Sequence, residues 1–339
     1  MRSVTRLVAA GAACLALAAC STPATGPSGS TVPARAGSVA SGSTGSPTST
    51  TRSTVAASTT PTPSLPTKPS GTGPPAHANA PQSYRTVAVH RGPDHPDDLV
   101  LDASGALLYS DYTNGTISRL NADGSSTVLH RGLDGPEGMV LLADGTLVVA
   151  EENTNRLLAF PAGRARPVVL TTLPGRPLKV TCHQGVDGIA WDARTSSLVV
   201  PDPVMGTIYR ITPDGTSRTV LARGFVHPVG AAVASDGSVF VADECGGDVW
   251  RLGAGGSRTR AARASMPDDV ALDGYGNLLV TDVRHSRHDL RRWPLRGGPS
   301  TVLAASGLIE PQGLLIDGSG RIYISDDQAR VILRLTPAS

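Results

Sequence analysis

The amino-acid sequence predicts an all-β fold, a β-propeller of six four-stranded blades, from three observations. A short motif, in which Pro usually precedes a polar or acidic residue and then Gly or Asp, recurs six times within residues 83–339. The motifs are 39 to 50 residues apart, and each opens a repeat of short apolar segments separated by turns, as in a propeller blade. The last repeat is one strand short, and a strand that would complete it stands before the first repeat.

The six motifs begin at Pro96, Pro136, Val186, Pro228, Pro267 and Pro311. In the first repeat we expect strands over residues 99–101, 106–109, 116–120 and 126–130. Gly-containing turns separate these strands, and Gly supplies the positive φ that tight hairpins need. Four antiparallel strands joined in this way make one blade.

The strand expected over residues 84–92 resembles the outer strands of other repeats. It ends in His-Arg-Gly, as residues 126–132 do, and residues 218–224 end in Ala-Arg-Gly. Only three strands follow Pro311, so residues 84–92 are predicted to complete the sixth blade and to join the two ends of the ring. A linear solenoid would not explain why the extra strand matches the missing one.

Residues 1–20 are expected to be a lipoprotein signal peptide. Arg2 and Arg6 precede an apolar stretch over residues 7–19, which is shorter than the roughly 20 residues that span a bilayer. The sequence Leu17-Ala18-Ala19-Cys20 resembles the bacterial lipobox, which implies lipidation of Cys20 and a place on the outer, extracytoplasmic face of the bacterial cell membrane. The alternative is an ordinary secretory signal with a cysteine there by chance.

Residues 21–82 are predicted to be a disordered tether. Of these 62 residues, 52 are Ser, Thr, Pro, Gly or Ala, and they show no hydrophobic periodicity. Such a segment cannot bury enough apolar surface to offset the entropy of ordering. The folded domain is therefore expected to be residues 83–339.

The charge of residues 83–339 argues against a nucleic-acid partner. They contain 25 basic and 28 acidic residues, a net charge of −3, whereas nucleic-acid binders carry strongly basic surfaces. We expect a monomer that contacts the membrane only through its lipid anchor, with a small-molecule substrate or a peptide, glycan or protein ligand at the channel face.

The repeats resemble those of the NHL-repeat and gluconolactonase/regucalcin group of six-bladed propellers. The resemblance rests on residues 311–326 and on the parallel run over residues 136–150, and it extends over residues 83–339. NHL propellers are frequently binding modules, whereas the gluconolactonase branch holds a metal in the channel and hydrolyses lactones or esters. The resemblance therefore implies the fold but leaves two classes of function open.

The second residue of each motif is expected to point into the central channel. In chain order these residues are Asp97, Glu137, Asp187, Val229, Asp268 and Gln312. Carboxylates gathered in one channel repel each other unless a cation neutralises them or some are protonated, and oxygen ligands favour calcium, magnesium or manganese.

By resemblance to gluconolactonases, the predicted metal ligands are Glu137, Asp187, Asp268 and Asp97. The sequence departs from that family's pattern, because no Asn occupies any of the six places and Val229 is inert. The alternative is that these acids only accept backbone hydrogen bonds at the start of each strand.

An insertion over residues 173–185 distinguishes the second repeat. It carries Cys182, and a disulfide to Cys245 would brace it over the channel mouth; two independent buried cysteines are the alternative. His183 lies four residues before Asp187, where it would serve as a general base or metal ligand unless it is merely an exposed loop residue. The basic loop over residues 284–288 would either grip an anionic group or be solvated.

Two further sets of aspartates recur with the repeat and are interpreted as turn caps. The first set ends the inner strands and consists of Asp102, Asp192, Asp273 and Asp317. The second set precedes the next turn and consists of Asp111, Asp243, Asp282 and Asp326.

The function expected from the sequence is metal-assisted hydrolysis of a small lactone or ester, with Asp187, Asp268 and His183 as catalytic residues. The alternative is a non-catalytic module that binds a peptide, glycan or protein. No Gly-x-Ser-x-Gly, His-Glu-x-x-His, P-loop or Cys-x-x-Cys motif supports another chemistry.

Overall fold

The computed structural model describes residues 80–284 and 287–338. The expected signal peptide, the lipidation site at Cys20 and residues 21–79 of the expected tether lie outside the described residues. Within the described residues, no helix has the length and apolar character that crossing a membrane requires.

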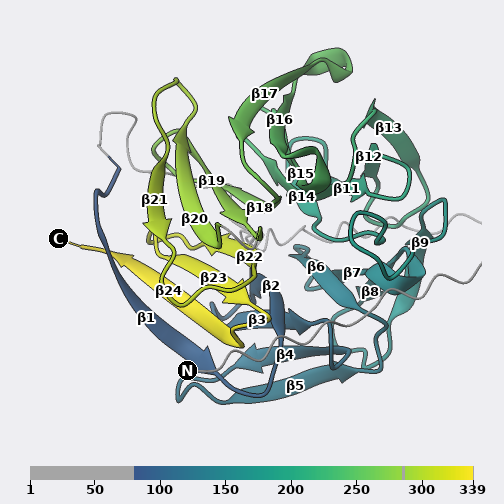
Figure 1. Ribbon diagram of the computed structural model, residues 1–339. Coiled ribbons are helices and arrows are strands. Elements are labelled where there is room, and N and C mark those ends of the chain that lie inside the picture. The colour runs from purple at the N-terminus through teal and green to yellow at the C-terminus, as the bar shows by residue number, and fades with distance from the viewer. Residues whose placement is uncertain (1–79, 285–286, 339) are drawn as a thin grey trace, which may run out of the picture. The chain divides into compact units, whose positions relative to one another are not determined.

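The described residues form six four-stranded antiparallel sheets, each of them one blade (Figure 1). Blade 1 contains β2 (Pro96–Leu101), β3 (Leu107–Asp111), β4 (Thr116–Leu120) and β5 (Ser126–Arg131). Blade 2 contains β6 (Pro136–Leu141), β7 (Leu147–Glu151), β8 (Arg156–Phe160) and β9 (Val168–Thr172). Blade 3 contains β10 (Ala190–Asp192), β11 (Ser197–Asp202), β12 (Thr207–Ile211) and β13 (Arg218–Arg223).

Blade 4 contains β14 (Pro228–Val233), β15 (Val239–Asp243), β16 (Asp248–Leu252) and β17 (Arg258–Arg263). Blade 5 contains β18 (Pro267–Leu272), β19 (Asn277–Asp282), β20 (Asp289–Pro294) and β21 (Thr301–Ala304). Blade 6 contains β22 (Pro311–Ile316), β23 (Ile322–Asp326), β24 (Val331–Pro337) and β1 (Tyr84–Arg91). The helical segments in the described part of the chain are short 3₁₀ turns, η1 (Glu152–Thr154), η2 (Glu244–Gly246) and η3 (Ala254–Gly256). The predicted all-β, six-bladed propeller is confirmed.

The N-terminal strand closes the ring, as the sequence predicts. β1 pairs antiparallel with β24, from Tyr84 opposite Pro337 to Arg91 opposite Val331. Figure 1 shows the two strands side by side although they come from opposite ends of the described chain. This pairing gives β24 its outer neighbour, so blade 6 has four strands like the other five blades and joins the two ends of the ring.

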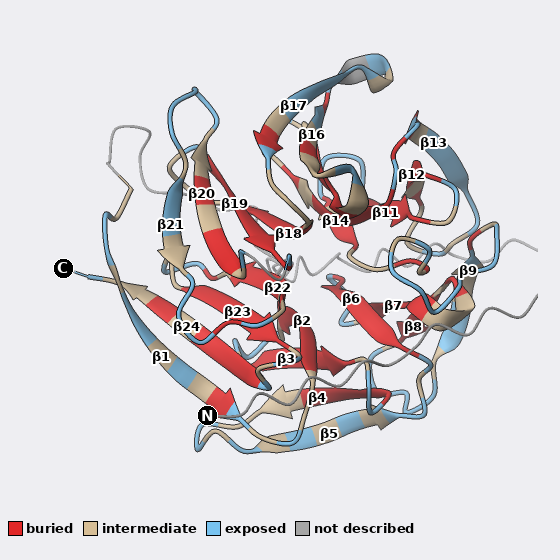
Figure 2. Ribbon diagram, in the orientation of Figure 1, coloured by how far each residue is buried: buried red, intermediate tan, exposed pale blue. Residues whose placement is uncertain are grey.

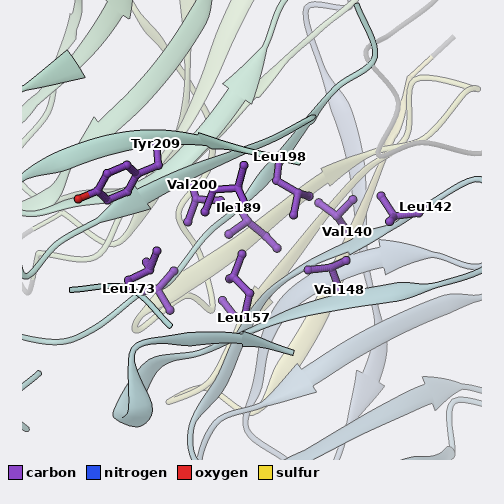
Figure 3. Packing of buried hydrophobic residues seen from close by; sticks show 12 residues of the cluster. Val140, Leu142, Val148, Leu157, Leu173, Ile189, Leu198, Val200 and Tyr209 are labelled. Atoms are coloured by element: carbon purple, nitrogen blue, oxygen red, sulfur yellow. The ribbon is translucent and has the colours of Figure 1, made fainter. Parts of the chain in front are cut away.

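Burial decreases from the centre of the ring to its periphery (Figure 2). The inner strand β6 is buried along its whole length, whereas the outer strand β5 alternates between half-buried and exposed residues. The core lies between neighbouring blades. In one such layer Val140 and Val148 of blade 2 pack with Leu198 and Val200 of blade 3 (Figure 3). The sheets therefore pack face to face through aliphatic side chains.

A bulge interrupts the pairing of the inner strand in five of the six blades. In blade 1 the register shifts between Pro96 and Leu99, and the same shift follows the motif Pro of blades 2, 4, 5 and 6. Blade 3 differs, because β10 begins only at Ala190 and its motif precedes the strand. In blade 3 the first motif residue is held by a side chain of blade 2, since the backbone N–H of Val186 donates to Asn155 Oδ1 at 2.9 Å.

Glycine at the third motif position allows the inner strands to pack closely. Gly138, Gly188, Gly230 and Gly313 occupy this position in four blades. A Cβ on Gly138 would lie 2.6 Å from the carbonyl oxygen of Asp187 in the next blade, and a Cβ on Gly230 or Gly313 would clash in the same way. A void of about 10 Å³ lies among the second and third motif residues of five blades.

Candidate functional site

A pocket of about 660 Å³ lies at the channel mouth. Its wall combines the motif residues, the residues just before them, the segments that follow the second strands, and the insertion. The lining residues are Asp97, Tyr112, Glu137, Glu152, Lys179, Val180, Thr181, Gln184, Asp187, His227, Glu244, Met266, Asp268, Val283, Arg284, Glu310, Gln312, Asp327 and Gln328. Eight of the lining residues carry a carboxylic acid. Two lining residues, Lys179 and Arg284, are basic and carry a positive charge.

The structure brings the four predicted metal ligands into this pocket, and Gln312 with them. Asp97, Glu137 and Asp187 each offer a carboxylate oxygen, and these oxygens lie within 4.8 Å of one another. The sixth motif residue, Val229, is buried in the core between blades 4 and 5 instead.

Burial raises the pKa of Asp97, Glu137, Asp187 and Asp268 well above the usual carboxyl range. Neighbouring carboxylates raise these pKa values further, because ionising one group places it beside another negative charge. A hydrogen bond between Asp97 and Glu137 lowers the pKa of Asp97 and raises that of Glu137, as expected when Glu137 carries the proton. In the absence of a cation, the group is therefore stabilised by protonation.

Gln312 holds the carboxylate of Asp268. With its amide nitrogen turned toward that carboxylate, Gln312 donates to Asp268 Oδ1 at 3.1 Å and to Oδ2 at 3.0 Å. An amide donor in place of a fifth acid at the motif positions restrains Asp268 without adding a negative charge to the pocket.

A second set of lining residues was not identified from the sequence. Glu152, Glu244 and Asp327 each follow the acid that ends a second strand, namely Glu151, Asp243 or Asp326. Burial raises the pKa of Glu152 to about 7 and that of Asp327 to about 7. These lining residues could have been found in the sequence as the residue that directly follows the recurrent acid. Tyr112 and Val283 occupy the same place in blades 1 and 5 and also line the pocket.

The recurrent acids at the ends of the second strands accept backbone hydrogen bonds, as the sequence predicts for Asp111, Asp243, Asp282 and Asp326. Asp243 Oδ1 accepts from the His227 N–H at 2.7 Å, and Asp326 Oδ2 accepts from the Glu310 N–H at 3.0 Å. These bonds fix the residue before each motif, which places His227, Met266 and Glu310 in the pocket wall. His227, Met266 and Glu310 were not predicted as pocket residues from the sequence.

The inner-strand aspartates are turn caps, as predicted. Asp102 Oδ1 accepts from the backbone N–H groups of Ser104 and Ala106 at 2.8 and 2.9 Å. Backbone N–H groups bond in the same way to Asp192, Asp273 and Asp317.

The insertion crosses to blade 4 through the predicted disulfide. Cys182 and Cys245 are bonded, with their Cα atoms 5.9 Å apart. The insertion contributes Lys179, Val180, Thr181 and Gln184 to the pocket wall. The disulfide therefore holds one side of the pocket in place.

His183 does not join the other predicted catalytic residues. It is exposed, is not part of the pocket lining, and its Nδ1 lies 3.2 Å from the Thr181 carbonyl oxygen. From the basic loop, Arg284 lines the pocket, whereas His285 and Ser286 lie outside the described residues.

The donor set of the pocket fits a divalent cation. Asp97, Glu137 and Asp187 supply only carboxylate oxygens, the ligands that calcium, magnesium and manganese prefer. Their closeness is unfavourable for three anions alone and favourable around a shared positive charge. These three residues would hold the ion.

Comparison with solved structures shows the same fold in proteins of different activity. A gluconolactonase from Xanthomonas campestris has a TM-score of 0.62 and 17% identity, covering 80% of this chain and 99% of its own. A streptogramin B lyase has a TM-score of 0.57 and 14% identity, covering 77% of this chain and 100% of its own. A chain of a nidogen/laminin complex has a TM-score of 0.54 and 17% identity, covering 65% of this chain and 85% of its own.

At these identities the likeness establishes the fold and leaves the activity open. No protein-family model matches the sequence, and the search of curated proteins found no match.

Proposed function

We propose that the pocket binds a divalent cation and hydrolyses a small lactone or ester. The observation that carries the proposal is the cluster of Asp97, Glu137 and Asp187, whose carboxylate oxygens lie within 4.8 Å of one another. A gluconolactonase shares the fold, so the fold is compatible with this chemistry. Calcium, magnesium and manganese are the candidate ions.

The residues of the pocket have separable roles in this proposal. Asp97, Glu137 and Asp187 would hold the ion, which when bound supplies a positive charge that polarises a carbonyl and acidifies water. Asp268, held by Gln312, accepts a hydrogen bond from the attacking water and orients it. The volume of about 660 Å³ admits a small ring lactone or a short ester with room for solvent.

A non-catalytic binding module is the second candidate, and exposed apolar side chains around the pocket favour it. Val180 of the insertion is 56% exposed, Val226 before His227 is 61% exposed, and Ile309 before Glu310 is 50% exposed. A surface of this kind suits a peptide, glycan or protein ligand larger than the pocket. The nidogen/laminin structure shows the fold within a protein complex.

Metal analysis of the purified full chain, followed by calorimetric titration with Ca²⁺, Mg²⁺ and Mn²⁺, tests the hydrolase proposal. We expect cation binding by the wild type, at least a tenfold loss of affinity in Glu137→Gln and Asp187→Asn, and no loss in Asp214→Asn. Asp214 is a matched control because it is an exposed aspartate in a turn. Five- and six-membered lactones and p-nitrophenyl acetate are the substrates for the activity assay.

Hydrolysis that chelation abolishes and the ion restores would support the proposal. Cation binding without hydrolysis of any of these substrates would favour the binding module. If the protein neither binds a cation nor hydrolyses any of these substrates, the metal-assisted mechanism is overturned.

We further propose that the protein is exported and held at the outer face of the bacterial cell membrane by a lipid on Cys20. The Cys182–Cys245 disulfide supports export, because disulfides form and persist mainly outside the cytoplasm. Cys20→Ser should release the protein from the membrane fraction. Mass spectrometry of the N-terminal fragment would detect the lipid directly.

A further inference from the structure

We propose that His227, oriented by Glu244, is the general base of the pocket. The proposal rests on the proposed hydrolase function and assigns the proton transfer that hydrolysis requires. His227 lines the pocket and is only 1% exposed, and its Nδ1 lies 2.9 Å from Glu244 Oε2.

The pairing with Glu244 determines which ring nitrogen is free. A carboxylate can only accept, so the proton of the neutral imidazole lies on Nδ1 and the lone pair on Nε2. Nε2 is buried and has no hydrogen-bond partner among the described residues. Leaving a buried polar atom unpaired costs about 1–3 kcal/mol, and a water molecule that hydrogen-bonds to Nε2 would remove that cost.

The backbone around the pair is fixed at both ends. The His227 N–H donates to Asp243 Oδ1 at 2.7 Å, and the Glu244 N–H donates to the His227 carbonyl oxygen at 2.9 Å. The residue after Glu244 is Cys245, which the disulfide ties to the insertion. These bonds hold the backbone of both partners in the orientation that the pairing requires.

Proton transfer fits this pair better than metal binding does. His227, Glu244 and Cys245 lie close enough together to resemble a metal site, but the Cys245 sulfur is committed to the disulfide and cannot act as a thiolate ligand. The remaining two groups already satisfy each other through Nδ1 and Oε2. The carboxylate trio of Asp97, Glu137 and Asp187 is a separate group of ligands.

The step assigned to His227 balances in atoms and charge. Nε2 takes a proton from water as the water oxygen bonds to the carbonyl carbon and the carbonyl π electrons move to its oxygen. The Glu244 carboxylate stabilises the imidazolium that forms. When the tetrahedral intermediate collapses, the C–O bond to the alcohol oxygen breaks and that oxygen takes the proton from Nε2, which restores the neutral ring.

Steady-state kinetics and cation titration of the full chain test the assignment together. For His227→Gln we expect kcat to fall roughly 10²- to 10⁴-fold, the range for loss of a general base, while Mn²⁺ affinity stays within about threefold of the wild type. His130→Gln is the matched control, because His130 stacks on Phe160 and is not part of the pocket lining. It should retain wild-type kcat.

The possible failures are distinguishable. An active wild type whose His227→Gln variant keeps full kcat would overturn the assignment and leave the hydrolase proposal intact. Loss of Mn²⁺ affinity in His227→Gln would show that His227 is a ligand of the metal ion and would overturn its role as the base. A wild type that hydrolyses none of the lactones or p-nitrophenyl acetate would remove the hydrolase proposal and this assignment with it.

The tautomer provides a readout that a merely structural role would not produce. In full chain labelled with ¹⁵N-histidine, we expect His227 Nδ1 to be protonated and Nε2 unprotonated in the neutral ring, and Glu244→Gln to change this distribution. A neutral His227 protonated at Nε2 in the wild type would overturn the proposal whatever the activity.

Discussion

The Asp98 carboxylate in blade 1 accepts a hydrogen bond from the backbone N–H of Met139 in blade 2, with 2.6 Å between Oδ2 and the nitrogen. Asp269 in blade 5 bonds in the same way to the Leu314 N–H in blade 6, at 2.9 Å. Both aspartates occupy the third motif position, where the other four blades have glycine. The third position therefore holds the ring together either by close backbone approach or by a carboxylate that joins two blades.

Replacing Asp98 by Ala should lower the free energy of unfolding by about 1–3 kcal/mol, because the buried Met139 N–H loses its acceptor. Urea denaturation of the full chain measures the change. Asp123→Ala is the control, since Asp123 is an exposed turn residue, and it should change stability little. Equal effects of the two substitutions would contradict a structural role for the link between blades.

Gly313→Ala should be destabilising by about 1–3 kcal/mol, because the added Cβ would clash with the Asp97 carbonyl oxygen and lie 2.8 Å from Asp98 Cα. Gly318→Ala is the matched control in the same blade, since a Cβ there meets nothing within 4 Å. Thermal unfolding of both variants gives the comparison. A Gly313→Ala protein as stable as Gly318→Ala would mean that the inner strands can separate without cost.

The ring architecture could be predicted because it repeats along the chain. Pro96 and Pro311 begin the first and last of six similar motifs, and the unmatched strand over residues 84–92 indicates closure. The acids at the second motif position followed from the same periodicity, since five of the six blades place this position in the pocket wall and Val229 of blade 4 is the exception.

The rest of the pocket depends on how loops from different blades converge. His183 is four residues from Asp187 and is exposed outside the lining, whereas His227, forty residues away, lies in the pocket wall. The prediction from sequence proximity that His183 lies beside Asp187 was wrong because the insertion turns back on itself. The His183 N–H donates to the Val180 carbonyl oxygen within this turn. The His227–Glu244 pair could not be predicted either, since it joins a loop before an inner strand to one after a second strand.

Removing the disulfide should lower stability by about 2–4 kcal/mol, because Cys182 and Cys245 are 63 residues apart and their bond restricts the unfolded chain. Thermal unfolding with and without a reductant measures this in the wild type, and the Cys182→Ser/Cys245→Ser double variant should not respond to the reductant. Thiol titration of the unfolded chain should detect two additional thiols after reduction. An unchanged thiol count would refute the pairing.

Glu152 should make the cation-free protein less stable as the pH rises from 5 to 8. Burial raises its pKa in the folded state to about 7, so the folded protein keeps a proton that the unfolded chain releases at lower pH. Stability from this group is therefore complete at low pH and is lost as the pH rises through about 7. Asp327, whose pKa burial also raises to about 7, acts in the same direction.

The comparison of wild type with Glu152→Gln measures this contribution together with the increase that the Glu152 charge causes in the pKa values of Asp97, Glu137 and Asp187. His130 acts in the opposite direction, since burial lowers its pKa, but it is present in both proteins and cancels. In EDTA, the free energy of unfolding from urea denaturation should fall by roughly 1–3 kcal/mol more in the wild type than in Glu152→Gln between pH 5 and pH 8. Asp123→Asn should follow the wild type, because hydrogen bonds from Ser125 lower the pKa of Asp123 and place its titration below this range. Parallel pH profiles for wild type and Glu152→Gln would show that Glu152 ionises in the folded pocket as readily as in the unfolded chain.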